Sequence, residues 1–176
     1  GPYAHKKAYD LLIQGEAGIL SVTGTEQETA KAGLSIADNA AGMYAYSSIL
    51  AALIERQRGG RGQHIEISML EALAEWMGFP LYYAFDDAPP PPRAGASHAT
   101  IFPYGPFRAG DGAMVMLGLQ NERGWVAFCE RVLLRPDLAR DERFATNSRR
   151  SAARVELRDL IHAAFAGLTA QEVVAR

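Results

Sequence analysis

The residues Ser35-Ile36-Ala37-Asp38-Asn39-Ala40-Ala41-Gly42 lead directly into an apolar run over residues 43–54. This pattern predicts a helix that begins near Asp38 and ends near Arg58, because the glycines that follow Arg58 stop helices. The run is apolar on every side, so we expect the helix to be buried. Asp38 would then be a carboxylate at the start of a buried helix.

A carboxylate in this place can do chemistry. The first turn of a helix leaves backbone N–H groups without partners and carries a partial positive charge, which keeps a carboxylate ionised and oriented. Such a group can attack a carbonyl and form a covalent intermediate, so Asp38 is the candidate nucleophile. A structural alternative fits the spacing equally well, because Ser35 and Asp38 match a capping box in which the acidic side chain only accepts a bond from an unpaired N–H.

Short motifs that share one family pattern extend through the first part of the chain. They are Gly18-Ile19-Leu20-Ser21-Val22-Thr23-Gly24, Ala37-Asp38, Gly42, Ile49-Leu50-Ala51-Ala52-Leu53, Arg56, Gly60-Arg61-Gly62-Gln63 and Ile65-x-Ile67-Ser68-Met69. Together they resemble the class III CoA-transferases, the CaiB/BaiF family, and the resemblance covers nearly the whole chain. It implies an α/β fold with part of a doubly wound, Rossmann-like large domain and part of a small α+β domain.

The resemblance also implies a mechanism. In that family, the aspartate at the place of Asp38 attacks an acyl-CoA to give a mixed anhydride and then an aspartyl-CoA thioester, which passes CoA to a new acid. Coenzyme A is therefore implied as a thioester substrate, with no tightly bound cofactor. Family members form intertwined homodimers, and their substrates lead us to expect a C4 to C5 dicarboxylate as the acid here.

Three further site residues come from the resemblance. Lys7, Tyr9 and Gln14 resemble the formyl-CoA transferase pattern, in which the lysine and the tyrosine lie close to CoA and the reacting carbonyl. The racemases of the same family have a histidine where this chain has Tyr9, so a two-base proton exchange lacks one partner. A transferase is therefore favoured over a 2-methylacyl-CoA racemase or isomerase. A non-catalytic assembly module, or a hydrolase that uses another group, are the remaining alternatives.

A run of four prolines within Asp86-Asp87-Ala88-Pro89-Pro90-Pro91-Pro92 divides the chain, since such a run favours an extended spacer. We expect residues 1–88 to belong to the large domain, residues 89–97 to form the linker and residues 98–176 to belong to the small domain. Before the linker, alternation in His64-Ile65-Glu66-Ile67 predicts a short strand, and the residues from Ser68 to Pro80 predict a helix.

The part after the linker predicts a β-hairpin followed by helices. Two apolar segments, ending near Phe107 and beginning near Met114, flank a Gly-Asp-Gly turn. The helices are expected at residues 125–134, 149–166 and from Thr169 onward. Within the second of these regions, four arginines at helical spacing predict a solvated face: Arg149, Arg150, Arg154 and Arg158.

Three polar residues near the hairpin leave their roles open. His98 is either a loop residue or a group that faces the active site. Gln120 and Asn121 could hydrogen-bond a substrate carboxylate or cap the next helix.

Composition narrows the class of protein. A net charge of −2 and a pI of about 6.1 give no support for nucleic-acid binding. The single cysteine, Cys129, has apolar neighbours that predict a buried, inert thiol and is compatible with a reducing compartment. We find no membrane-spanning segment or signal peptide and no metal-ligand spacing, and expect a cytoplasmic protein without a metal.

The ends of the sequence complete these expectations. The chain opens without Met and stops in a predicted helix, and members of the resembled family are more than twice as long. We expect an internal piece of a larger protein, which by itself would be inactive because part of the donor set for the reaction lies elsewhere.

Overall fold

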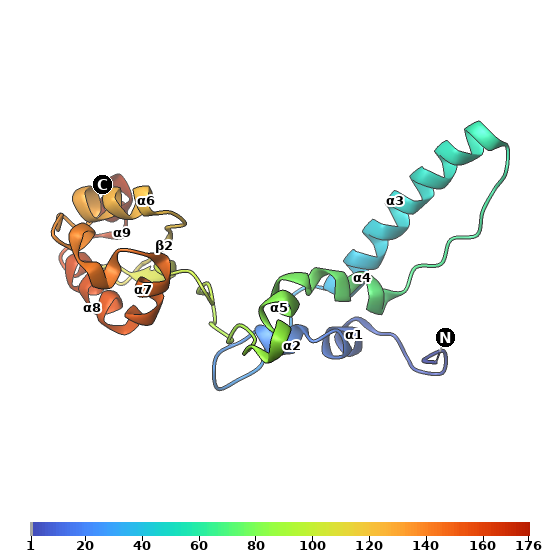
Figure 1. Ribbon diagram of the computed structural model, residues 1–176, viewed down its shortest axis with the longest axis horizontal. Helices are drawn as coiled ribbons and strands as arrows, with labels where there is room; N and C mark the ends of the chain where they lie inside the picture. The colour runs from blue at the N-terminus through green and yellow to red at the C-terminus, as the bar shows by residue number, and fades with distance from the viewer. Residues whose placement is uncertain (1) are drawn as a thin grey trace. The chain divides into compact units, whose positions relative to one another are not determined.

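The computed structural model describes residues 2–176, which pack into two compact units. The first unit ends at Gly95 and the second begins at Ala96. Figure 1 colours the chain along its sequence, so that the first unit runs from blue to green and the second from yellow-green to red.

The first unit is helical. Its elements are α1 (Asp10–Glu16), α2 (Ile19–Val22), α3 (Ile36–Gly59), α4 (Met69–Trp76), α5 (Gly78–Tyr83) and a short 3-10 turn (Phe85–Asp87). The predicted helix after Asp38 is confirmed as α3, and it ends as expected: Gly60 has a φ of +73° and its N–H donates to the carbonyl of Arg56 at 2.8 Å. This left-handed turn favours glycine because glycine has no Cβ.

The expected burial of α3 is wrong for this chain. Only Ala37 and Ala40, in its first two turns, are buried, and they pack with α1 and α4 in a small core. Farther along, Met43, Tyr46 and Ile54 are 62%, 61% and 53% exposed. Figure 1 shows why, because the second half of α3 has no other helix beside it. An apolar sequence can only be buried where another element covers it.

The first unit, as far as the structure describes it, contains no β-strand. The predicted strand over residues 64–67 is wrong for this chain, because these residues have no ladder partner and belong to no regular element. An isolated bridge joins Gly24 and Thr29. The helix predicted from Ser68 is confirmed, although it breaks into α4 and α5 at Met77. Trp76, the last residue of α4, is 47% exposed.

The second unit is built on the predicted hairpin, which is confirmed. Strands β1 (Tyr104–Arg108) and β2 (Met114–Gly118) pair antiparallel, with Phe107 opposite Val115. The peptide bond between Phe102 and Pro103, just before β1, is cis. The helices are α6 (Glu122–Ala127), a π-helical turn (Phe128–Val132), 3-10 turns (Leu138–Arg140 and Glu142–Phe144), α7 (Asn147–Ala152), α8 (Arg154–Phe165) and α9 (Ala170–Ala175).

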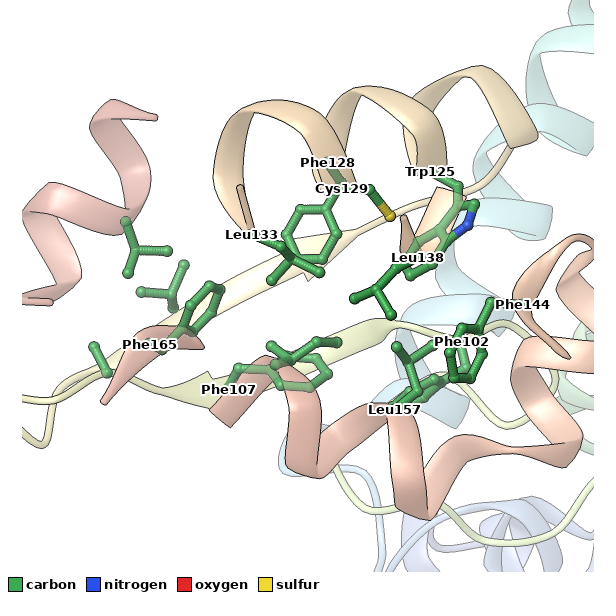
Figure 2. Packing of buried hydrophobic residues seen from close by; sticks show 14 residues of the cluster. Phe102, Phe107, Trp125, Phe128, Cys129, Leu133, Leu138, Phe144, Leu157 and Phe165 are labelled. Atoms are coloured by element: carbon green, nitrogen blue, oxygen red, sulfur yellow. The ribbon is translucent and has the colours of Figure 1, made fainter. Parts of the chain in front are cut away.

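Aromatic residues fill the centre of the second unit, as Figure 2 shows. Phe107 from β1, Trp125 from α6 and Phe165 from α8 are almost completely buried and belong to one cluster with Cys129. Burial raises the pKa of the Cys129 thiol to about 12. The predicted burial of the thiol is therefore confirmed, and the raised pKa disfavours the thiolate, which is the reactive form of cysteine.

Arg150 is a correction to the predicted arginine face. It is fully buried, and its guanidinium pairs with Glu122 at 2.6 Å and donates to the carbonyls of Phe144 and Phe102 at 2.9 and 3.2 Å. It also lies over the Trp125 ring, 5.2 Å from the centroid, and the indole N–H has no partner among the described residues. The helix breaks between α7 and α8, so Arg150 does not share one continuous face with the later arginines.

Within residues 2–176, no helix is both long and apolar enough to cross a lipid bilayer.

Candidate functional site

Asp38 lies in the first turn of α3, and its side chain is exposed. The predicted capping box is absent: within the described part of the chain, Ser35 makes no side-chain hydrogen bond to the helix start. The alternative that Asp38 serves only as the acidic half of that box is therefore not supported. An exposed carboxylate at the positive end of a helix is free to meet a ligand.

Asp10 takes the place expected for Ser35. Its Oδ1 accepts a hydrogen bond from the backbone N–H of Ala37, at 2.8 Å, although the two residues are far apart in the sequence. This bond satisfies one of the N–H groups that a helix start leaves unpaired. Asp10 is itself the first residue of α1, so one carboxylate ties the beginning of α1 to the beginning of α3.

Gln14 completes this connection. It is fully buried, and its Nε2 donates to Oδ2 of Asp10 at 2.7 Å and, more weakly, to the carbonyl of Leu34 at 3.5 Å. Its Oε1 accepts from the N–H of Ala32 at 2.8 Å. A buried amide with these partners fixes the loop that leads into α3. Asp10 and Gln14 therefore hold in place the helix turn that presents Asp38.

The other two predicted site residues lie on the approach to α1. Tyr9 is the N-cap residue of α1 and is exposed, and it directly precedes Asp10, which contacts the start of α3. Tyr9 thus directly precedes a residue that is hydrogen-bonded to Ala37, the residue before Asp38. Lys7 is also exposed and lines a hollow of about 1050 Å³ that reaches Ser68 and Glu71 at the start of α4. Asp38 does not line this hollow.

Asp10 is the residue that reasoning from the sequence missed. The sequence placed it beside Tyr9, at the point of comparison with the racemases, but gave it no role of its own. The available signal was an acidic residue with a polar residue four positions later, Gln14, a spacing that places both on one face of a helix. Nothing in local spacing connects that pair with Ala37.

The open alternatives in the second unit can also be placed. Asn121 caps α6, since its Oδ1 accepts from the N–H of Gly124 at 2.8 Å, which confirms the capping alternative. His98 packs its ring against Tyr104, with 5.2 Å between centroids, and its Nδ1 accepts from the N–H groups of Thr100 and Ile101. His98 thus helps to shape the loop before β1.

Comparison with known proteins gives the chain its relatives. The protein family described as "CoA-transferase family III" matches residues 1–176. A succinate–glutarate CoA-transferase of Agrobacterium fabrum is 36% identical over 162 residues, which is 92% of this chain and 40% of that protein. An acetyl-CoA:oxalate CoA-transferase of Acetobacter aceti is 33% identical over 86% of this chain and 39% of its own length.

Solved structures agree with the sequence relatives. A CaiB/BaiF family protein from Brucella suis superposes with a TM-score of 0.78 at 33% identity, covering 99% of this chain and 46% of that one. A hypothetical protein from Mycobacterium tuberculosis gives a TM-score of 0.81 at 26% identity, with the same coverage. The chain thus spans about two fifths of the length of the curated relatives it matches and has the α/β fold of these neighbours. By sequence and by fold, the chain belongs to CoA-transferase family III.

Proposed function

We propose that this chain is part of an enzyme that transfers coenzyme A from an acyl-CoA to a carboxylic acid, with Asp38 as the covalent nucleophile. The observation that carries the proposal is an exposed carboxylate in the first turn of α3, held there by the contacts of Asp10 and Gln14. Membership of CoA-transferase family III supports the reaction class. Relatives that are named as CoA-transferases support it as well.

The reaction proceeds in balanced steps. A carboxylate oxygen of Asp38 attacks the thioester carbonyl, the C–S bond breaks, and CoA leaves as the thiolate, which gives a mixed anhydride. The thiolate then attacks the aspartyl carbonyl and releases the donor acid, which leaves an aspartyl-CoA thioester. The acceptor carboxylate displaces CoA in the same way, and the thiolate takes the acceptor acyl group and regenerates Asp38. Each attack requires an ionised, correctly placed carboxylate or thiolate.

The start of α3 supports this chemistry. The positive end of the helix attracts negative charge, so a substrate carboxylate or thiolate is also favoured there. The bond from Ala37 to Asp10 keeps the first turn from fraying. The oxyanion that forms in each attack needs fixed donors, each contributing about 3 to 4 kcal/mol in a comparable acyl-transfer site. Further segments of the enzyme would complete that donor set.

The supporting residues have different parts in this proposal. Tyr9 is exposed next to Asp10, and the role proposed for its hydroxyl is a contact with the reacting carbonyl. Lys7 offers an ammonium group to a phosphate or carboxylate of the substrate. Gln14 is buried and acts through Asp10, so its contribution is to hold the nucleophile in place.

We further propose that the acids are short dicarboxylates and that the enzyme is an intertwined homodimer of the cytoplasm. The names of several relatives support the acids: succinate, glutarate, oxalate and mesaconate occur in them. The apolar surface that α3 leaves exposed is compatible with cover by further protein.

The test is made on the full-length enzyme with Asp38→Ala and Asp38→Asn. We expect the intact mass to gain an aspartyl-CoA adduct with succinyl-CoA in the wild type, hydroxylamine to trap it, and both variants to lose the adduct and at least about 10⁴-fold in kcat. Glu26→Gln, another exposed carboxylate, is the matched control and keeps activity. Normal turnover in Asp38→Ala contradicts the proposal. Exchange of deuterium from heavy water into a 2-methylacyl-CoA would instead support the racemase alternative.

A further inference from the structure

The two units differ in their charge. Residues 96–176 carry eleven arginines, no lysine and nine carboxylates, a net charge of +2, whereas the chain as a whole has −2. Guanidinium groups are planar and match phosphate and carboxylate oxygens in pairs. The second unit is therefore the more favourable part of the chain for an anion-binding site.

Two of these arginines lie close together against the same aromatic ring. Arg154 begins α8, and Arg158 follows one helical turn later. Their guanidinium carbons lie 5.5 and 5.7 Å from the centroid of the same ring, that of the buried Phe102. Burial, and after it the charge of Arg158, lowers the pKa of Arg154, which agrees with their closeness. Two like charges have been brought together on one aromatic side chain.

Neither charge is neutralised by an ion pair within residues 2–176. Among the described residues, ion pairs occupy the neighbouring arginines Arg143, Arg149 and Arg150, but not Arg154 or Arg158. Glu156, the acidic residue between the pair on α8, is bonded to Arg143 instead. Adjacent cations with no counter-charge repel each other, and an anion placed between them removes that repulsion.

Hydrogen bonds fix the loop that lies beside Arg154. Arg154 donates through one Nη2 hydrogen to the carbonyl of Ala99 at 3.1 Å, which leaves most of its five N–H donors for a ligand. Asn147 and Ser151, from α7, both donate to the carbonyl of Thr100, at 2.9 and 3.2 Å. The loop, α7 and the start of α8 therefore form one fixed corner, and a ligand would find the Arg154 guanidinium already in place.

We propose that Arg154 and Arg158 form a binding site for a phosphate group. Two adjacent guanidinium charges match a phosphate monoester, which carries close to two negative charges at pH 7, better than a single carboxylate. The phosphate belongs either to a free phosphate ion or to the phosphate groups of coenzyme A. The site stands on the geometry of the second unit alone, whereas its assignment to coenzyme A rests on the proposed function.

The experiment follows the arginine Nε–Hε signals of the ¹⁵N-labelled full chain during separate titrations with inorganic phosphate, CoA and dephospho-CoA, at an ionic strength fixed with chloride. We expect the signals of Arg154 and Arg158 to move. Arg154→Gln and Arg158→Gln should each weaken binding about tenfold, the size of one lost charge-assisted contact. Arg131→Gln, which removes an exposed arginine of the same unit, is the charge-matched control and should leave binding unchanged.

The affinities for the three ligands distinguish free phosphate from a phosphate group of coenzyme A. Tighter binding of CoA than of dephospho-CoA assigns the site to the terminal phosphate monoester of CoA, and binding of inorganic phosphate alone assigns it to free phosphate. Arg158→Lys keeps the charge and loses the planar fork, so it should bind several-fold more weakly while the exposed position leaves the fold intact. Asp38→Asn should bind phosphate normally, whether or not Asp38 is the nucleophile. Equal affinities for Arg158→Gln and Arg131→Gln overturn the proposal.

Discussion

The two units of the chain differ in how completely they cover their own apolar side chains. Among the described residues, the core of the second unit contains fourteen buried hydrophobic residues, including several aromatic rings, and that of the first contains six, two of them alanines of α3. The large hydrophobic residues of α3 and α5 are mostly exposed. A unit that buries its apolar surface can fold by itself, whereas one that leaves it exposed depends on further contacts.

Expressing the two units separately is the strongest test of this difference between them. Residues 96–176 expressed alone should unfold in one cooperative thermal transition, because their core is complete. Residues 1–95 alone should unfold broadly and bind the dye ANS, because their apolar helices are uncovered. Circular dichroism and dye fluorescence measure both. A sharp transition without dye binding for residues 1–95 would contradict the distinction.

Arg150→Met tests the most tightly bonded position of the second unit. The change leaves the carbonyls of Phe102 and Phe144 without their donor and Glu122 without its partner. We expect the free energy of unfolding to fall by about 3 kcal/mol, measured by urea denaturation. Arg149→Met is the neighbouring control. Its ion pair with Glu142 is exposed and long, 3.9 Å, and its hydrogen bond to the carbonyl of Glu142, at 2.9 Å, is exposed as well, so the loss should be much smaller. Equal losses of unfolding free energy in Arg150→Met and Arg149→Met would contradict this prediction.

Asp10→Ala tests the hydrogen bond that joins α1 to the start of α3 in the first unit. The change removes the acceptor for the N–H of Ala37, and a lost helix cap typically costs about 1 kcal/mol. Hydrogen exchange in the first turn of α3 should accelerate accordingly. Ser35→Ala is the control at the residue that the sequence predicts as the cap. It should leave exchange unchanged, because Ser35 makes no capping bond within the described residues. Faster exchange in Ser35→Ala but not in Asp10→Ala would show that Ser35, and not Asp10, caps α3.

The smallest expected effect is the pH dependence of Glu122. The hydrogen bond from Arg150 lowers the pKa of Glu122 below its usual value of 4.5. The folded state therefore binds the proton less readily than the unfolded state, so Glu122 stabilises the fold above pH 4.5 and loses this contribution as the pH falls. Comparing the unfolding free energies of wild type and Glu122→Gln between pH 7 and 3 should show the difference shrinking toward acid. A constant difference would contradict this prediction.

The sequence predicted those elements whose causes are local. The hairpin of β1 and β2 follows from two apolar segments around a Gly-Asp-Gly turn, and the end of α3 follows from Gly60, whose left-handed backbone favours glycine. The placement of Asp38 in the first turn of a helix is also local. Each of these depends on neighbouring residues alone.

The predictions that failed depend on distant parts of the chain. The burial of α3 depends on what covers it, and its cap comes from Asp10 in another helix. Arg150 shares helical spacing with exposed arginines, but a helix break and the carbonyls of Phe102 and Phe144 place it in the core. Periodicity describes one helix and carries no information about partners elsewhere in the sequence.

The place of Trp125 gives the chain a built-in optical probe. Its indole is 1% exposed beneath Arg150, whereas the other tryptophan of the chain, Trp76, is 47% exposed in the first unit. An enclosed indole emits at shorter wavelength than one in water, so the two units contribute separate components to a single emission spectrum. Loosening of the second core would shift the blue component to the red, and a protein or ligand that covers Trp76 would shift the red component to the blue, with no label attached.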